Sequence, residues 1–269
     1  MPVYWFALSF VKDIHTFHAA LVFFIIHILV YPSSNGYNSY MDRDTTSIGG
    51  IEKPLQPTNQ LFVFTVIMDV LAVLLALIIS PLIAACIFIY IIFSRLYSYR
   101  KIRLKQYAII GYLIVILNQG SLIFFTVFHA ANKDANAIIP WTGIVCAALL
   151  IGGFYPITQI YQHKEDAADK VKTISMMLGK KGTFIFCAFI YAIAFALLFF
   201  YFSSINKLFL FGILILFFLP VLIYFTVWFL DVNKNINNAD FKHTMRMNKI
   251  ASTCTNLAFI TLLILNQLD

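Results

Sequence analysis

The sequence has few charged residues: aspartate, glutamate, lysine and arginine together make up 12% of its 269 residues. Hydrophobic residues make up 61% and the mean hydropathy is +0.85, so a water-soluble domain would have no place to bury its apolar side chains. The sequence also lacks low-complexity stretches and any polar segment long enough for a separate soluble domain. These absences indicate one integral membrane domain over residues 1–269.

Cysteine is scarce as well, and its placement argues against a metal centre built on thiolates. The four cysteines fall inside apolar runs, far apart in the sequence and without the short spacings typical of metal ligands. We expect small core side chains at these positions. They are Cys86, Cys146, Cys187 and Cys254.

The sequence is rich in long apolar runs. A helix needs about 20 mainly apolar residues to span a bilayer, and eight runs are candidates. They cover residues 17–31, 61–80, 82–95, 107–128, 137–155, 182–203, 207–230 and 250–267. The runs do not alternate with a period of two, so we expect helices rather than barrel strands. The predicted fold class is all-α, a polytopic membrane bundle of eight to nine transmembrane helices.

Two local features refine this prediction. Residues 1–11 are apolar but few, so they form either a ninth, partial helix or a segment lying at the membrane interface; we favour the partial helix. Pro81 separates two apolar runs with almost no loop between them, which predicts a tight antiparallel helical hairpin.

Lysine and arginine are distributed unevenly between the two sides of the predicted bundle. Sixteen of the nineteen basic residues fall in four alternate loops, at 32–60, 95–106, 156–181 and 231–249. Because basic loops stay in the cytoplasm, we expect these four loops there, at the inner or plasma membrane if the cell is bacterial. The net charge of +7 then reflects topology and contact with anionic lipid rather than nucleic acid.

One twelve-residue stretch occurs twice, at 31–42 and at 155–166, and each copy follows a long apolar run. At a constant offset of 124, seven of the twelve positions match like for like without a gap. The matched pairs are Tyr31 with Tyr155, Pro32 with Pro156, Ser34 with Thr158, Asn35 with Gln159, Tyr37 with Tyr161, Asn38 with Gln162 and Asp42 with Asp166. The repeat predicts two related halves, roughly 17–130 and 137–269, which build one polar site together.

Each copy carries amide and carboxylate side chains at a helical spacing. If each copy continues the helix before it, Asn35, Asn38 and Asp42 share one helix face. The equivalent face of the second copy consists of Gln159, Gln162 and Asp166. Such oxygens suit Mg²⁺, which is usually completed by waters and by phosphate oxygens of a substrate. We therefore expect the two faces to converge and bind a diphosphate through a metal; the alternative is that these residues only cap helices.

Three segments resemble motifs of the UbiA-type intramembrane prenyltransferases. Residues 38–44, NSYMDRD, with EKP at 52–54, look like the family's first acidic motif, N-D-x-x-D-x-x-x-D. Residues 162–169, QHKEDAAD, followed by KTISMMLG at 172–179, are similar to its second motif, D-x-x-x-D with a K-x-T-L run and Leu-Gly. Residues 97–105, YSYRKIRLK, resemble the loop of members that prenylate aromatic rings.

The resemblance implies a nine-helix bundle around a central cavity that binds an isoprenyl diphosphate through Mg²⁺. Carried over by position, the metal ligands would be Asn38, Asp42, Asp44, Asp166 and Asp169. The catalytic residues would be Asn38, Asp42 and Asp166, together with Arg103 and Lys105, which would face the diphosphate.

The sequence departs from the family pattern at acid positions of both motifs. Thr46 stands where the first motif has its last aspartate, and Asp44 is the nearest acid. Gln162 stands where the second motif has its first aspartate in the register that the internal repeat supports. A second register, which pairs Glu165 with Asp169, restores two carboxylates but breaks the offset of the repeat. The number of metal ions therefore stays open.

Other polar residues near the motifs are candidates for substrate contact. Tyr37 and Tyr161 either line the cavity or anchor the chain at the interface, and His163 could orient a carboxylate or accept a proton. Asp69 and 118–119 lie within apolar runs, so they should face the cavity or make buried hydrogen bonds. The predicted substrate contacts are Asn35, Tyr37, Lys53, Gln159, Tyr161, Gln162, His163, Asn118 and Gln119.

These groups favour transfer of an isoprenyl group from an isoprenyl diphosphate to a lipophilic acceptor, such as an aromatic or quinone precursor, within the membrane. Mg²⁺ and the cations of the 95–106 loop would neutralise the leaving diphosphate, and aromatic side chains would stabilise an allylic cation away from water. The first alternative is a terpene cyclase of the same architecture, which needs no acceptor. A transporter is the second alternative, since transporters also combine repeats with membrane-embedded acids.

Overall fold

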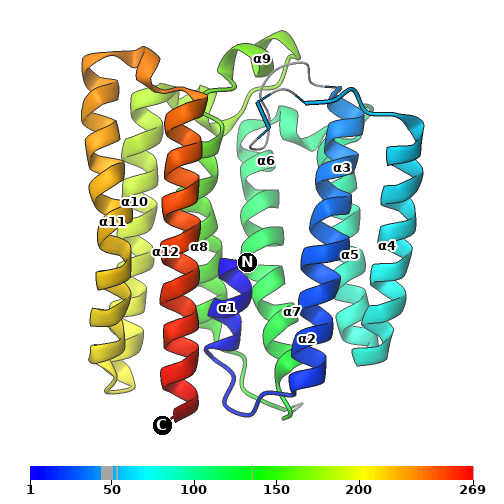
Figure 1. Ribbon diagram of the computed structural model, residues 1–269, viewed down its shortest axis with the longest axis vertical. Helices are drawn as coiled ribbons and strands as arrows, with labels where there is room; N and C mark the ends of the chain where they lie inside the picture. The colour runs from blue at the N-terminus through cyan, green and yellow to red at the C-terminus, as the bar shows by residue number, and fades with distance from the viewer. Residues whose placement is uncertain (44–50, 53, 135, 269) are drawn as a thin grey trace.

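The structure is a computed structural model that describes residues 1–43, 51, 52, 54–134 and 136–268. Across these residues the fold is helical, and an isolated β-bridge joins Ile14 to Asn132. Eight helical segments are long and apolar enough to span a bilayer, and they pack together in one bundle (Figure 1). The predicted all-α membrane bundle is confirmed.

Two of the eight spans contain a π-helical turn. The first span consists of α2 (Thr16–Phe24), a π-helix (Ile25–Val30) and α3 (Tyr31–Asp42). The fourth consists of α6 (Ala108–Val115), a π-helix (Ile116–Leu122) and α7 (Ile123–Ala131). The other spans are α4 (Asn59–Ile79), α5 (Pro81–Ser98), α8 (Trp141–Thr158), α10 (Ile174–Ser204), α11 (Leu208–Lys234) and α12 (Phe241–Leu268). Short elements are α1 (Pro2–Leu8), α9 (His163–Ala168) and 3₁₀ turns at Leu104–Gln106 and Ile236–Asn238.

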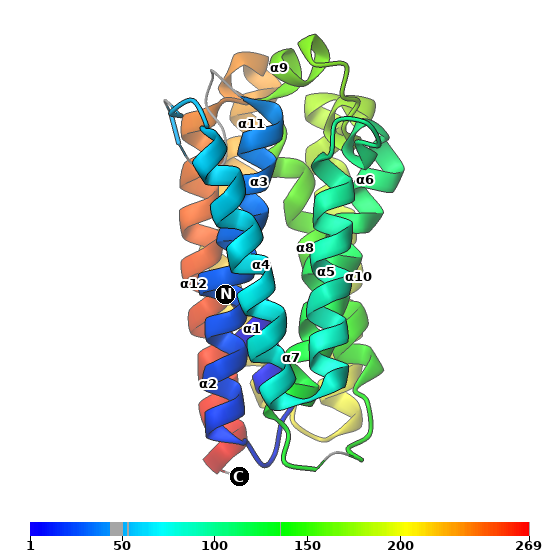
Figure 2. The same cartoon turned by 90° about the vertical axis from the view of Figure 1, so that its right-hand side faces the viewer.

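Consecutive spans run antiparallel, so their connections alternate between the two ends of the bundle (Figures 1 and 2). The connections after α3, α5, α8 and α11 lie at one end together with α9; we call it the long-loop end. At the opposite end α4 and α5 form the tight hairpin that the sequence predicts. Ser80 is the single residue between them, and its hydroxyl accepts a hydrogen bond from the backbone N–H of Ile83 at 3.2 Å.

Helix α1 is enclosed by the bundle rather than laid on its surface. Five of its seven residues are buried, and the hydroxyl of Tyr4 donates a hydrogen bond to the carbonyl oxygen of Ala19 at 2.9 Å. The helix packs on α7 and α12, and residue 1 lies near the middle of the bundle's height (Figure 1). The structure therefore agrees with a partial helix, and the interfacial alternative is wrong.

Aromatic packing fills the bundle around α1. Phe6 is fully buried, and its ring centroid lies 4.7 Å from that of Phe259 on α12 and 5.4 Å from that of Phe124 on α7. On the outer faces large apolar side chains are exposed, such as Phe189 at 63% and Ile223 at 62%. Apolar surface of this extent needs hydrocarbon around it. The chain is an integral, multi-pass membrane protein.

The two copies of the repeated stretch fold differently. The first continues its span as helix up to Asp42, with Pro32 in the first turn of α3 directly after the π-helix. The second does not: α8 ends at Thr158, a tight turn follows, and α9 begins only at His163. Our prediction of one continuous helical face in the second copy is wrong. Pro156 has no N–H to donate and crowds the preceding turn, which weakens α8 close to its end.

Candidate active site

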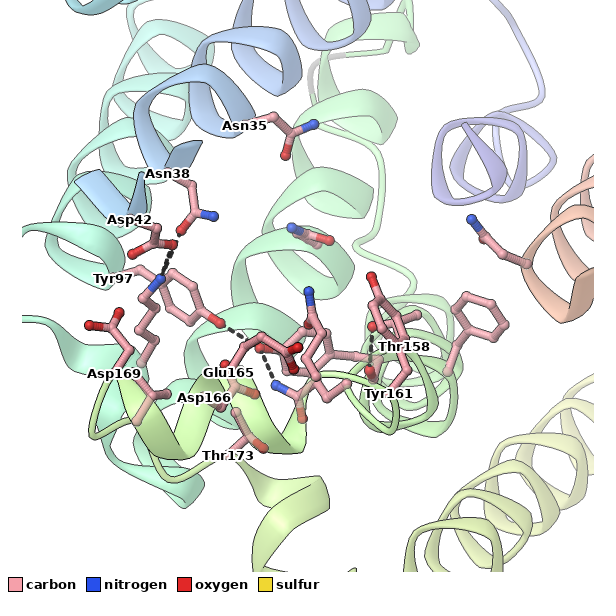
Figure 3. Close-up of a pocket in the computed structure, with 18 of the residues that line it drawn as sticks. Asn35, Asn38, Asp42, Tyr97, Thr158, Tyr161, Glu165, Asp166, Asp169 and Thr173 are labelled. Atoms are coloured by element: carbon pink, nitrogen blue, oxygen red, sulfur yellow. Dashed lines mark hydrogen bonds and ion pairs between the residues drawn. The ribbon is translucent and has the colours of Figure 1, made fainter. Parts of the chain in front are cut away.

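A cavity of about 500 Å³ lies at the long-loop end and extends between the helices (Figure 3). Both copies of the repeat line it. The first copy contributes Asn35, Asn38 and Asp42; the second contributes Tyr155, Thr158, Gln159, Tyr161, Gln162, Glu165 and Asp166. The α5–α6 loop adds Arg103 and Lys105, and α8 and α12 supply part of the remaining wall. The two halves of the chain therefore build one site.

Asp42, the last residue of α3, lies between two cations from the loop after α5. Lys105 forms an ion pair with the Asp42 carboxylate and donates a second hydrogen bond to Oδ1 of Asn38 at 3.2 Å. A guanidinium nitrogen of Arg103 lies 3.4 Å from the other carboxylate oxygen of Asp42. Because the Asp42 side chain is only 4% exposed, these partners compensate a carboxylate that has lost most of its water.

Arg103 also binds Asp169 of the second acidic motif. It forms an ion pair with the carboxylate and donates to the backbone carbonyl of the same residue at 2.9 Å, while Arg100 contacts the second carboxylate oxygen at 2.9 Å. Burial raises the pKa of Asp169, but its hydrogen bonds and charge contacts with Arg103 and Arg100 outweigh burial and lower that pKa overall. Burial likewise lowers the pKa of Arg103, and the contacts with Asp169 and Asp42 raise it overall. The two acidic motifs are thus joined through one guanidinium.

Behind this cluster, amide and hydroxyl groups of the second copy meet α5. Nε2 of Gln159 donates to the hydroxyl of Tyr155 at 2.8 Å, and that hydroxyl is hydrogen-bonded to the hydroxyl of Tyr97. Gln159 is buried, and its Oε1 has no hydrogen-bond partner in the described part of the chain. Glu165 and Asp166 of α9 line the same side of the cavity (Figure 3). A buried carbonyl oxygen without a donor is suited to bind a cation or a ligand hydroxyl.

The sequence model of the UbiA prenyltransferase family matches residues 1–250. The chain belongs to the UbiA prenyltransferase family. This confirms the resemblance to that family and the predicted enzyme class, a prenyltransferase. A search of curated proteins gives no match.

Solved structures of UbiA homologues share this fold. A UbiA homolog from Archaeoglobus fulgidus bound to GPP and Mg²⁺ superposes with a TM-score of 0.68 at 16% identity, over 97% of this chain and 94% of that one. A UbiA homolog from Aeropyrum pernix K1 gives 0.65 at 15% identity, over 97% of both chains. A structure described as digeranylgeranylglyceryl phosphate synthase in membranes gives 0.63 at 22% identity, over 98% and 91%.

Most residues predicted for a UbiA-type site line the cavity. They are Asn35, Asn38, Asp42, Arg103, Lys105, Gln119, Gln159, Tyr161, Gln162, Asp166 and Asp169. Glu165 is also part of the lining, so the structure places the acids of both registers of the second motif at the same cavity. Asp44, Thr46 and Lys53 lie outside the described residues.

Three predicted substrate contacts lie away from the cavity lining. Tyr37 is buried, and its ring centroid lies 4.0 Å from the guanidinium carbon of Arg95. Asn118 donates a hydrogen bond to a backbone carbonyl of α5 at 3.2 Å, which is the interhelical contact we weighed against substrate binding. His163 is hydrogen-bonded through Nε2 to the hydroxyl of Ser175 at 2.8 Å, so it ties α9 to α10.

Sequence reasoning gave no role to several residues that line the UbiA-type cavity. Tyr97 lies in the loop motif and Tyr155 in the repeat, so a signal was present for both. Met245 and Asn248 of α12 belong to no motif. Asn248 could have been found from its position, because it lies two residues before Ile250, close to the beginning of the last apolar run. A polar side chain there is costly unless it faces a cavity.

Proposed function

We propose that the protein transfers an isoprenyl group from an isoprenyl diphosphate to a lipophilic acceptor inside the membrane, in a reaction that requires Mg²⁺. The observation that carries this proposal is a contact network: Asp42, Asp169, Arg103 and Lys105 meet at a cavity that continues into an apolar bundle. The charged part of the cavity suits a diphosphate, and its apolar part suits an isoprenyl chain.

The charges of the cavity support a requirement for a divalent cation. Among the described residues four carboxylates line it, from Asp42, Glu165, Asp166 and Asp169. Among the described lining residues only two cations, Arg103 and Lys105, oppose them, and both are already paired with carboxylates. A diphosphate bound here therefore needs further positive charge, because uncompensated charge is costly away from water.

The side chains present fit Mg²⁺. Within the described residues, no group of three or more His, Cys, Asp or Glu side chains is arranged to hold a metal, so an all-protein ligand set of that kind is missing. The cavity instead offers a mixed set of carboxylate and amide oxygens, among them Asp42, Asp166 and the unpartnered Oε1 of Gln159. Mg²⁺ is commonly held by one or two carboxylates, with water and phosphate oxygens completing its shell. A UbiA homolog has been seen with GPP and Mg²⁺, which supports this assignment.

The residues of the chain then have distinct tasks. When bound, Mg²⁺ would neutralise negative charge on the diphosphate and so favour its departure from the allylic carbon. Arg103 and Lys105 would turn from the carboxylates to the diphosphate oxygens and donate charge-assisted hydrogen bonds to them. Asp42 and Asp169 would thereby be released to bind the metal. Tyr97, Phe154 and other aromatic side chains of the lining would stabilise the allylic cation.

The acceptor defines the finer part of the proposal. We infer an aromatic or quinone-precursor acceptor from the resemblance of residues 97–105 to the corresponding loop of members that prenylate aromatic rings. A terpene cyclase remains the alternative, because it would use the same cavity without an acceptor. Membership of a prenyltransferase family argues against the transporter. From the basic loops we further infer that the long-loop end faces the cytoplasm.

The test is turnover of purified protein in detergent with Mg²⁺ and geranyl, farnesyl or geranylgeranyl diphosphate, first without and then with an acceptor pool. Diphosphate release and the hydrocarbon extract are analysed together. Prenylated acceptor supports transfer; cyclic or linear hydrocarbons made without acceptor would show a cyclase. Asp42→Ala and Asp166→Ala are expected to lower diphosphate release about 100-fold or more, whereas Asp134→Ala, at the opposite end of the bundle, serves as the matched control. Release without Mg²⁺ would contradict the proposal.

A further inference from the structure

Three of the neutral amide side chains that line the cavity come from three different spans. They are Asn35 on α3, Gln119 on the second π-helix and Asn248 on α12. All three are exposed although they lie within spans of the bundle, and a polar side chain within a span faces a cavity rather than lipid. The exposed surface of these amides is therefore surface that a ligand in the cavity can contact.

Asn35 is separated from the charged cluster. Asn35 precedes Asp42 by seven residues on one continuous helix, which is about 10 Å along the axis at 1.5 Å per residue. In Figure 3 the side chain of Asn35 lies well apart from Asp42 and Asp169, on the far side of Asn38. A diphosphate bound by Arg103 and Lys105 would thus leave Asn35 free to contact another part of the substrates.

The hydrogen-bonding capacity of the amides is largely unused. Within the described part of the chain, neither Asn35 nor Asn248 makes a side-chain hydrogen bond, while Gln119 contacts the hydroxyl of Tyr90. Each carboxamide offers two N–H donors and one carbonyl acceptor. An isoprenyl chain has no atom that could use them. Amides facing the cavity from three spans are therefore better suited to a molecule that carries oxygen.

The described residues that line the cavity include no free cation. Among described lining residues the cations are Arg103 and Lys105, which are paired with Asp42 and Asp169 in this state and which the diphosphate would occupy during transfer. A carboxylate or phosphate on the acceptor would find no free cation among these residues, at a high cost in a low-dielectric site. A neutral head group would meet no such penalty.

We propose that Asn35, Gln119 and Asn248 form the acceptor subsite, and that the acceptor has a neutral oxygen head group, such as a phenol, a hydroquinone or an alcohol, rather than a carboxylate or a phosphate. The proposal rests on the transfer function proposed above. It also explains why an amide of α12, outside every motif, belongs to the site.

The first test compares acceptors in pairs of similar shape that differ in charge. Purified protein with Mg²⁺ and geranylgeranyl diphosphate is given 4-hydroxybenzamide or 4-hydroxybenzoate, and an alkylglycerol or its phosphate. We expect kcat/KM to be at least about tenfold higher for the neutral member of a pair, since no cation of the described lining is left free to pair with an anionic acceptor. A preference for the charged member, or no transfer to any neutral acceptor while diphosphate is released, would overturn the proposal.

The second test changes the subsite. Asn248→Leu and Asn35→Leu should raise the KM for the neutral acceptor about tenfold, because the head group loses a hydrogen bond, while the KM for the prenyl diphosphate stays within about twofold. Asn248→Lys should reverse the preference within each pair by supplying a cation. The control is Asn256→Leu, an amide on the same helix outside the cavity lining, which should leave both KM values unchanged. If the KM of the diphosphate changes as much as that of the acceptor, the subsite assignment is wrong.

The two proposals fail in different ways. If diphosphate release does not depend on Mg²⁺ and on Asp42, the transfer function itself fails. If release and transfer are intact but Asn248→Leu leaves the acceptor KM unchanged, only the acceptor subsite fails.

Discussion

Arg95 and Asp69 form an ion pair between α5 and α4, away from the cavity lining. Nε and Nη2 of Arg95 donate to the same carboxylate oxygen of Asp69, with the Nε contact at 2.9 Å. The hydroxyl of Ser33 on α3 donates to the other oxygen at 2.5 Å. One carboxylate thereby joins three spans. Of the two roles expected for Asp69, the structure shows the buried hydrogen bond and not a contact with the cavity.

Removing one partner of this ion pair should destabilise the folded protein. In Asp69→Leu the guanidinium of Arg95, whose side chain is only 20% exposed, would lose its partner, and we expect the free energy of unfolding to fall by about 3 kcal/mol. The double variant Asp69→Leu/Arg95→Leu should recover most of this loss, since no uncompensated charge remains. Thermal unfolding in detergent measures both. A double variant as unstable as the single one would show that the ion pair is not the cause.

Replacing Lys105 should weaken diphosphate binding and departure without unfolding the protein. Lys105→Met removes a cation whose present partners are Asp42 and Asn38, and we expect kcat/KM for the prenyl diphosphate to fall about 100-fold. Lys105→Arg keeps the charge and should retain more activity than Lys105→Met. Steady-state kinetics at saturating Mg²⁺ give the values, and Lys133→Met at the opposite end is the matched control. Equal activity of the Met and Arg variants would argue against a role for the charge.

The sequence was sufficient to predict the spans and the convergence of the motifs. The spans and the hairpin at Pro81 could be predicted from local composition, because the thickness of the bilayer sets the length of an apolar helix. The placement of the basic loops is likewise predicted from composition alone. The internal repeat correctly predicted that Asp42 and Asp166 line the same cavity. These features need no knowledge of how helices rotate against each other.

Other features depended on packing that the sequence does not display. The helix of the second copy breaks at Gln159, and this break depends on the hydrogen bonds of the turn after Pro156. The repeat did not predict the break, because the equivalent Pro32 follows a π-helix and its span continues as helix. Tyr37 matches Tyr161 in sequence, yet Arg95 holds its ring away from the cavity lining. The contribution of Asn248 depends on the rotation of α12, which only the assembled bundle determines.

His163 should make the stability of the protein depend on pH. Burial, followed by the charge of Lys180, lowers the pKa of His163 from its ordinary value of 6.5, so the folded state favours the neutral ring that is bonded to Ser175. The unfolded chain binds the proton more readily, so stability is fully present above about pH 6.5 and is lost as the pH falls below it. Asp169, with a pKa lowered from 3.8, would contribute a loss only at more acidic pH.

The measurement for this prediction is the unfolding midpoint in detergent at pH 7.5 and 5.5. Wild type should lose more stability between these values than His163→Gln, which keeps a hydrogen-bonding side chain but does not titrate. The same loss in both proteins would show that other groups cause the pH dependence.

Gly120 should be intolerant of even one added methyl group. A Cβ built there would lie 2.6 Å from Cα of Ala148 and 2.8 Å from the carbonyl oxygen of Ala147, both backbone atoms of α8. Backbone cannot rotate aside as a side chain can, so Gly120→Ala must push α8 away from the π-helix, and we expect a loss of about 2 kcal/mol of stability.

Because Gln119 is the neighbouring residue and lines the cavity, the same shift should raise the KM of the acceptor. Gly212→Ala is the matched control: Gly212 also lies inside a span, but a Cβ there meets no atom within 4 Å. Both substitutions lower the conformational entropy of the unfolded chain by the same amount. The difference between their unfolding midpoints therefore measures the contact between α8 and the π-helix. Equal midpoints for the two variants would mean that α8 and the π-helix are not closely packed at Gly120.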